Sequence, residues 1–247
     1  MRPQLRAELL KQRTSGTALG VFAAMLGLVA LAVLLHGLVP RGNLDSSSEQ
    51  LMVLGRGEFL GSLFAAILGA LSITSEFRHG TIRPTLLVSP RRERVVAAKV
   101  WVSTLSGAGL GLAGAALAAG LGSAVLSSRG IDIRLGGGDY ALLVAGGAAA
   151  AALWAAIGVG LGALVRNQVP TLIGICAWLL FVEGLLVGDV TGVGDVGRFA
   201  PGALGQAISG QAPDTLVAPA VGLVLLAVYA AAAALAGALV TTRRDVA

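Results

Sequence analysis

Long apolar runs with little or no formal charge alternate with short polar segments along the chain. A membrane-spanning helix needs about 20 mostly apolar residues. The segments that fit this requirement are 17–39, 58–75, 100–128, 140–165, 168–187 and 215–242. We therefore predict an all-α polytopic membrane protein in which residues 1–247 form a single transmembrane domain with six transmembrane helices.

The composition agrees with this interpretation of the pattern. Hydrophobic residues make up 55% of the chain and charged residues 13%, and the mean hydropathy is +0.83. Soluble domains carry roughly 25% charged residues, so about half of the usual charge is missing. The chain has 36 Gly but only 8 Pro and no G-X-Y period, which excludes collagen-like and disordered classes.

The net charge of +5 raises the question of nucleic-acid binding. The cations lie in the gaps between apolar runs, however, so we expect membrane lipid and not nucleic acid as their partner. By the positive-inside rule the cytoplasmic side has the excess of Lys and Arg. One side holds Arg2, Arg6, Lys11, Arg13, Arg78, Arg83, Arg91, Arg92, Arg94, Lys99, Arg166, Arg243 and Arg244, and the other holds Arg41, Arg56, Arg129, Arg134 and Arg198. We predict cytoplasmic termini and, from the Ala-, Gly- and Val-rich composition, a bacterial cell membrane.

The sequence carries no pattern typical of an active site. Its one cysteine, Cys176, lies in an apolar run, and its two histidines, His36 and His79, lie far apart. Walker A, G-x-S-x-G and H-E-x-x-H patterns are absent from the sequence. We predict that the chain is not an enzyme and binds neither a cofactor nor a metal by itself.

Glycine pairs recur at four-residue spacing at Gly16/Gly20, Gly57/Gly61, Gly107/Gly111 and Gly158/Gly162. Such pairs let helices approach closely in lipid, so we expect them at helix-packing faces.

Several polar segments lie outside the spans. Residues 2–14 fit an N-terminal interfacial helix on the cytoplasmic leaflet, and the alternative is a solvated anchor for the first span. Residues 189–214 contain a helix-compatible stretch, which favours a short outer-face or re-entrant helix before the last span over an unstructured loop. The segment 40–57 is predicted to be a polar outer loop without a motif.

The longest cytoplasmic polar stretch runs from Ser75 to Lys99. Thr81 can cap the start of a short helix, since threonine is a common N-cap residue. Pro84 would fall in the first turn of that helix, where proline is tolerated. Ser89 followed by Pro90 is a second helix start, leading into the third span. The pattern predicts a short helix at about 81–88 between two spans, and the alternative is a plain basic loop.

This stretch resembles the first cytoplasmic loop of ABC-2 type transporter permeases. Those proteins read E-[YF]-R-x-G-T-[IL]-[RK], a short helix, and then P-R-x-R-x-x-x-A-K; here Glu76-Phe-Arg-His-Gly-Thr-Ile-Arg is followed by Pro90-Arg-Arg and Lys99. Weaker likenesses are Gly162-Ala-Leu-Val-Arg-Asn-Gln, Trp178 with Glu183, and Gly197-Arg-Phe-Ala-Pro. Pro84 departs from the pattern, so the helix is expected to start later than usual.

The resemblance implies a permease that pairs with a second permease chain and docks a separate ATP-binding subunit. ATP and Mg would be bound by that partner, and the segment at about 81–88 would be its coupling helix. The coupling residues implied are Glu76, Arg78, Gly80, Thr81, Ile82, Arg83, Leu86 and Leu87. Export is usual in the family, and the small apolar spans favour a hydrophobic or amphipathic cargo.

Glu183 is the one carboxylate that the pattern places well inside a span, so it is a candidate substrate or gate residue. Its alternatives are contact with water or a pair with Arg198. A different class of function is a non-transporting membrane protein with the same fold, such as a sensor, immunity factor or scaffold. An ion channel or secondary carrier is poorly supported, because mid-membrane polar groups and broken helices are scarce.

Overall fold

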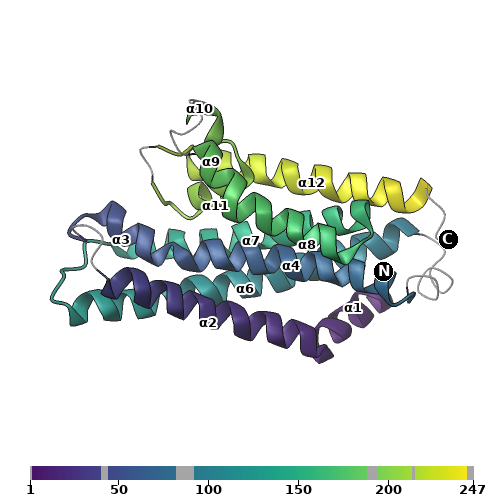
Figure 1. Ribbon diagram of the computed structural model, residues 1–247, viewed down its shortest axis with the longest axis horizontal. Helices are drawn as coiled ribbons and strands as arrows, with labels where there is room; N and C mark the ends of the chain where they lie inside the picture. Colours follow the sequence, from purple (N-terminus) through teal and green to yellow (C-terminus); the bar gives the residue numbers. More distant parts are fainter. Residues whose placement is uncertain (1, 40–43, 82–91, 188–193, 213–214, 244–247) are drawn as a thin grey trace.

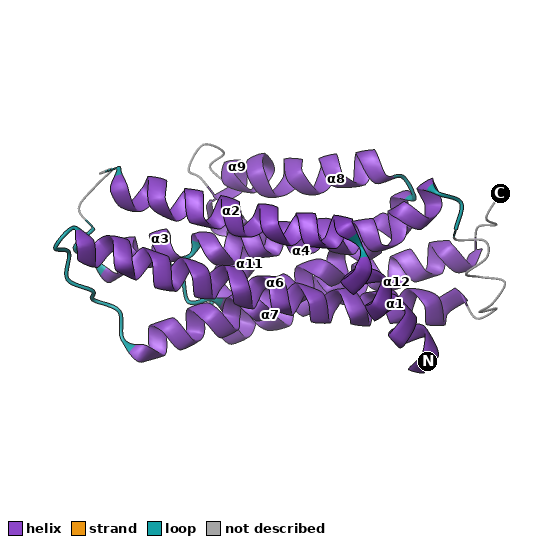
Figure 2. Cartoon of the chain, turned by 90° about the horizontal axis from the view of Figure 1, so that it is seen from below, coloured by secondary structure: helices purple, strands orange, loops and turns teal. Residues whose placement is uncertain are grey.

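The computed structural model describes residues 2–39, 44–81, 92–187, 194–212 and 215–243, and these residues contain helices and no strand. Six helices or near-continuous helix pairs are long and apolar enough to cross a membrane, which confirms the predicted all-α class and number of spans. Figure 1 shows them running side by side along the long axis of the molecule. Figure 2 shows the same bundle turned by 90°.

The described helices range from four to 37 residues in length. Their bounds are α1 Arg2–Thr14, α2 Gly16–Leu38, α3 Ser47–Leu54, α4 Arg56–Arg78, α6 Arg92–Ser128, α7 Gly137–Val165, α8 Gln168–Ala177, the π-helical turn η1 Trp178–Val182, α9 Glu183–Val187, α10 Gly194–Gly197, α11 Pro201–Ile208 and α12 Pro219–Arg243. The end of the bundle that holds α1 and the last turn of α12 is called the α1 end below, and the opposite end is called the α11 end (Figure 1).

Four predicted spans differ from the helices observed by two residues or more at their start. The fourth begins at Gly137 and not at residue 140, and the last begins at Pro219 and not at residue 215. The second begins at Arg56 and not at residue 58, directly after α3, so that Ser47–Arg78 is one nearly continuous helical stretch. The third is longer than predicted, because α6 extends the apolar run backward to Arg92.

The predicted outer loop at 40–57 is the main error, since α3 occupies much of it. Ser46 caps this helix by accepting a 3.3 Å hydrogen bond from the backbone N–H of Glu49. The Ser-x-x-Glu spacing at 46–49 is the local signal for such a start. Gln50 is buried at the middle of α3 and donates to the carbonyls of Leu44 and Asp132, which ties the helix to the loop that follows α6.

The centre of the bundle consists of α4, α6 and α7, which all pack against one another. Helix α2 covers α6 and α4, while α12 and α8 lie against α7. Exposed large apolar side chains remain on the outer helices, including Leu31 of α2, Ile173 of α8 and Val224 of α12. This distribution suits a bundle that has an apolar solvent around it.

Three of the four glycine pairs lie at the central packing faces, as predicted. A Cβ atom at Gly57 would lie 2.4 Å from the Gly114 carbonyl oxygen, and one at Gly158 would lie 2.1 Å from that of Ala66. Gly107 and Gly111 approach the backbone of α7 in the same way. The fourth pair, Gly16/Gly20, faces nothing within 4 Å, so the prediction is wrong for α2 within this chain.

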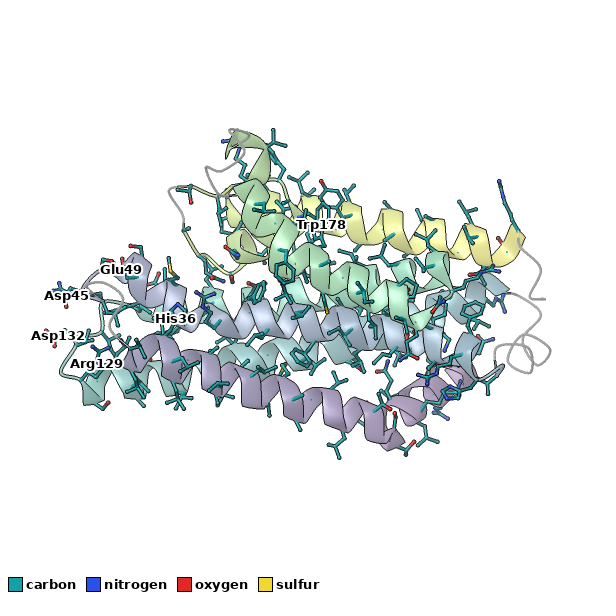
Figure 3. All side chains as sticks on the ribbon, viewed as in Figure 1. His36, Asp45, Glu49, Arg129, Asp132 and Trp178 are labelled. Atoms are coloured by element: carbon teal, nitrogen blue, oxygen red, sulfur yellow. The ribbon has the colours of Figure 1, made fainter. Side chains whose placement is uncertain are left out.

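Helix α11 confirms that the segment before the last span contains a short helix. It packs against α12, α7 and α4 and begins with Pro201. Several charged residues gather at the same end of the bundle, as Figure 3 shows for Asp45, Glu49, Arg129 and Asp132.

Candidate functional site: two polar centres at opposite ends of the bundle

Four charged side chains form an ion-pair cluster at the α1 end: Glu8, Lys11, Glu76 and Lys99. The Lys99 ammonium donates to Glu8 Oε2 at 2.9 Å and to Glu76 Oε1 at 2.8 Å, and its side chain is fully buried. Lys11 donates to Glu8 Oε1 at 2.9 Å and to the same Glu76 oxygen at 2.8 Å. The cluster joins α1, α4 and α6, and its two cations and two carboxylates balance in charge.

The charges of the ion-pair cluster shift two of its pKa values. Burial by itself would raise the pKa of Glu8, but the charge of Lys99 and hydrogen bonds from Lys11 and Lys99 outweigh it and hold this pKa below its ordinary value. Burial would lower the pKa of Lys11, but hydrogen bonds to Glu76 and Glu8 raise it above its ordinary value. Both shifts favour the charged forms.

Further polar contacts extend the ion-pair cluster along α6. Lys99 also donates to the Ser72 carbonyl at 2.9 Å, and Gln12 donates to Ser103 Oγ at 3.3 Å. A cavity of about 620 Å³ borders the cluster and is lined by parts of α1 and α4. The second oxygen of Glu76, Oε2, is buried and accepts no hydrogen bond from the described residues.

The expected coupling residues divide between this site and the undescribed segment. Glu76 belongs to the ion-pair cluster, whereas Arg78 donates to Gln168 Oε1 at 3.3 Å, at the start of α8. Gly80 has a φ of +68° just beyond the end of α4, a conformation that favours glycine. Thr81 follows in a turn. Ile82, Arg83, Leu86 and Leu87, and nearly all of the predicted coupling helix, lie outside the described residues.

Arg166 connects three helices at the α1 end. It stands just after α7 with a φ of 56°, donates to the Val240 carbonyl of α12 at 2.8 Å, and lies 5.5 Å over the Phe77 ring of α4. Arg166 belongs to the segment 162–168 that resembles the permease family, so that segment contains a residue that links helix ends.

The second polar centre lies at the α11 end, around Glu183. Its side chain is 6% exposed, and Oε1 accepts from the Trp178 indole N–H at 2.7 Å and from the Gly202 backbone N–H at 2.6 Å. Figure 3 labels Trp178, which begins η1. The donor from Gly202 is one of the free N–H groups in the first turn of α11, so Glu183 fastens α9 to the start of that helix.

Glu58 is the second buried carboxylate of this centre, and the sequence prediction missed it. It is 2% exposed and accepts from Ser62 Oγ at 3.0 Å and from Gln211 Nε2 at 3.3 Å. The sequence singled out Glu183 as the one carboxylate well inside a span, whereas the candidate span Ser47–Arg78 also contains Glu58. Glu58 stands in the first turn of α4, and because α3 directly precedes α4, it lies within the nearly continuous helical stretch Ser47–Arg78.

Helix α11 makes room for both carboxylates with two glycines one turn apart. A Cβ atom at Gly202 would lie 1.8 Å from Glu183 Oε2, and one at Gly205 would lie 2.7 Å from Glu58 Oε1. Glu183 does not pair with Arg198; the guanidinium of Arg198 lies 5.0 Å over the Phe199 ring.

Sequence reasoning also missed most of the ion-pair cluster. Glu8 and Lys99 are separated by 91 positions, and only the crossing of α1 and α6 brings them together. The one local signal was Glu8 itself, a carboxylate among the cations of residues 2–14.

Neither polar centre has the arrangement of a metal site, since no group of three or more His, Cys, Asp or Glu side chains comes together among the described residues. What the two centres can do is bind charge and hold helices in register. No protein-family model matches this chain, and no curated protein matches it either.

Proposed function

We propose that this chain is the membrane-spanning permease subunit of an ABC exporter, driven by a separate ATP-binding subunit. It would work with a second permease chain in a bacterial plasma membrane, with both termini cytoplasmic and α1 lying at the cytoplasmic interface. ATP and Mg would bind to the partner subunit. The cargo would be a small hydrophobic or amphipathic compound.

One observation carries the proposal: the two ends of the family-like stretch contact each other. Glu76 and Lys99 lie 23 positions apart in the sequence, and the Lys99 ammonium donates to the Glu76 carboxylate at 2.8 Å. This ion pair holds the end of α4 to the start of α6, on either side of residues 82–91. A segment held at both ends by a rigid pair of helices is suited to transmit a displacement from a docked subunit to the spans.

The ion-pair cluster adds α1 to the same frame. Glu8 contacts Lys99, and Lys11 contacts Glu76, so a push on one of the three helices reaches the others. A mere basic loop needs no buried, charge-balanced support of this kind, because positively charged loops orient a membrane protein without specific contacts.

The test is purification of the full chain from its native membrane in mild detergent, followed by identification of the proteins that accompany it. Wild type is compared with Leu86→Asp in the proposed coupling helix and with Ile133→Asp as the control. Ile133 is an exposed residue in the loop between α6 and α7, at the α11 end.

We expect a nucleotide-binding ATPase with wild type and with Ile133→Asp, and its loss with Leu86→Asp. Recovery of the ATPase with all three proteins would support the permease and contradict the docking segment. Absence of any ATPase from a folded, intact wild-type chain would overturn the proposal in favour of a non-transporting sensor, immunity factor or scaffold.

A further inference from the structure

A cavity of about 390 Å³ lies at the α11 end beside Glu183, and we call it the outer pocket. Its walls come from α3, α4, η1, α9 and α11. Its polar lining residues are Arg56, Glu183, Gln206 and Gln211, and its large apolar lining residues are Met52, Phe59, Leu179 and Leu180. The volume falls in the range of small-molecule sites, and the mixture of a few polar groups with apolar walls is typical of them.

Among the described residues, the Glu183 carboxylate in the outer pocket has no cationic partner. Both donors to Glu183, the Trp178 indole and the Gly202 backbone, are neutral and contact Oε1. Its other oxygen, Oε2, accepts no hydrogen bond from the described residues. A buried carboxylate without a counter-charge is costly, and a cationic ligand group would relieve that cost.

The Arg56 guanidinium in the same pocket likewise has no anionic partner in the part of the chain that the structure describes. Arg56 contacts His36 Nε2 through Nη2 at 3.0 Å, and its Nε is buried without a hydrogen-bond partner among the described residues. No ion pair joins Arg56 to Glu183 or to any other carboxylate that the structure describes. The Arg56 side chain lines the outer pocket, and the planar fork of N–H donors on a guanidinium is well suited to a phosphate or carboxylate group.

We infer that the outer pocket binds a zwitterionic amphiphile whose polar head carries both an ammonium group and a phosphate or carboxylate group. The ammonium contacts Glu183, the anionic group contacts Arg56, and the apolar part lies along Phe59, Leu179 and Leu180. A ligand with a single charge would pair with either Glu183 or Arg56 and leave the other residue without a counter-charge. The inference does not depend on transport, so it stands or falls separately from the proposed function.

The position of the outer pocket fits a ligand with an apolar tail. Two of its lining residues, Met52 and Leu180, are 58% and 47% exposed, so apolar surface continues from the cavity to the outside of the bundle. An ammonium group beside an anionic group occurs both in a phosphoethanolamine lipid and in a soluble amino-acid-like compound. Only the lipid has an acyl tail, so the effect of that tail on affinity distinguishes the two ligands.

The test uses the purified full chain in phosphatidylglycerol nanodiscs, which supply no ammonium group. Binding is followed by the fluorescence of Trp178, whose indole contacts Glu183, after subtraction of the signal from Trp178→Phe. The probes are lysophosphatidylethanolamine, lysophosphatidylglycerol of the same chain length, dodecylammonium, and phosphoethanolamine without a tail.

Wild type should bind lysophosphatidylethanolamine at least tenfold more tightly than either single-charge probe. Weak binding of phosphoethanolamine would assign a lipid as the source, and equally tight binding would assign a soluble compound. Glu183→Gln should remove the preference for lysophosphatidylethanolamine over lysophosphatidylglycerol. Arg56→Gln should weaken all three phosphate-bearing probes and leave dodecylammonium unchanged, and Asp132→Asn, an exposed carboxylate at the same end, should bind like wild type.

Gln206→Lys provides a variant that keeps every hydrogen bond of Glu183. It places an ammonium group in the outer pocket and should abolish the preference for lysophosphatidylethanolamine even if Glu183→Gln fails to fold. Equal affinity of wild type for the ammonium-bearing and ammonium-free lysolipids would overturn the inference. So would an unchanged preference in folded Glu183→Gln or Gln206→Lys, with folding judged by gel filtration and thermal unfolding.

Discussion

At the α1 end, the carboxylates of Glu8 and Glu76 face the ammonium groups of Lys11 and Lys99, whereas at the α11 end Glu58 and Glu183 face neutral donors. All four carboxylates are buried. Matched charges lock their elements together, because removing either partner leaves an uncompensated charge behind. Unmatched buried charges cost free energy in the fold and stay available to a ligand.

This difference predicts the largest effect at Lys99, the fully buried cation of the ion-pair cluster. Lys99→Met keeps most of the side-chain volume but leaves Glu8 and Glu76 with Lys11 as their only cationic partner among the described residues. The free energy of unfolding should fall by about 3–5 kcal/mol, the usual loss when a buried ion pair is broken. Thermal unfolding in detergent measures it, and a loss below about 1 kcal/mol would show that the ion-pair cluster does not hold the helices.

The second prediction compares the two ends directly by the same substitution. Glu76→Gln should cost about 2–4 kcal/mol, because the charge of Lys99 loses half of its compensation in a buried site. Glu58→Gln should cost less than about 1 kcal/mol, because the amide oxygen still accepts a hydrogen bond and no cation is left unmatched. Unfolding curves of the two variants, measured in one detergent, provide the comparison. Equal losses would remove the distinction between the two ends.

The sequence predicted the spans well because each one is a local property. A run of about 20 consecutive apolar residues is long enough to cross the membrane as a helix. The closely spaced glycines of α4, α6 and α7 are also a local signal, and they indicated helix-packing faces. The loop interpretation of 40–57 failed although Ser46 and Glu49 carried a local helix-start signal, because the polarity of the segment was given more weight.

The two polar centres could not be predicted in the same way. Lys99 meets Glu8 and Glu76 only after three helices have packed, and no spacing rule connects positions 8, 76 and 99. Glu183 was recognised because it interrupts an apolar run, whereas Glu58 was hidden by its place two residues after a helix start that the pattern put too late.

Gly202 offers a smaller and more specific test of the α11 end. A methyl group there would lie 1.8 Å from Glu183 Oε2, so Gly202→Ala should lower the free energy of unfolding by about 1–3 kcal/mol through overpacking. The penalty should largely disappear when Glu183 is also replaced by alanine, and a double-mutant cycle measures that coupling. The control Gly174→Ala faces open space on α8 and should gain about 0.5–1 kcal/mol. Equal penalties for Gly202→Ala with and without Glu183 would contradict the contact.

The smallest effect expected is the pH dependence of the ion-pair cluster. Glu8 has a folded-state pKa below its ordinary value of 4.5, so its contribution is present above that pH and is lost as the pH falls through the folded-state pKa. Lys11 has a pKa above its ordinary value of 10.5, so its contribution is present below that pH and is lost as the pH rises through the raised pKa.

Unfolding temperatures of wild type and variants across pH separate the two contributions. Glu8→Gln should remove part of the acid-side loss of stability below pH 4.5, and Lys11→Met should remove part of the alkaline-side loss above pH 10.5. The Lys11 side chain is 52% exposed, so solvent screens it and its whole contribution should stay below about 1 kcal/mol. If Lys11→Met cost as much as Lys99→Met at neutral pH, burial would not be what distinguishes the two cations, and the ion-pair cluster would depend on the number of its contacts instead.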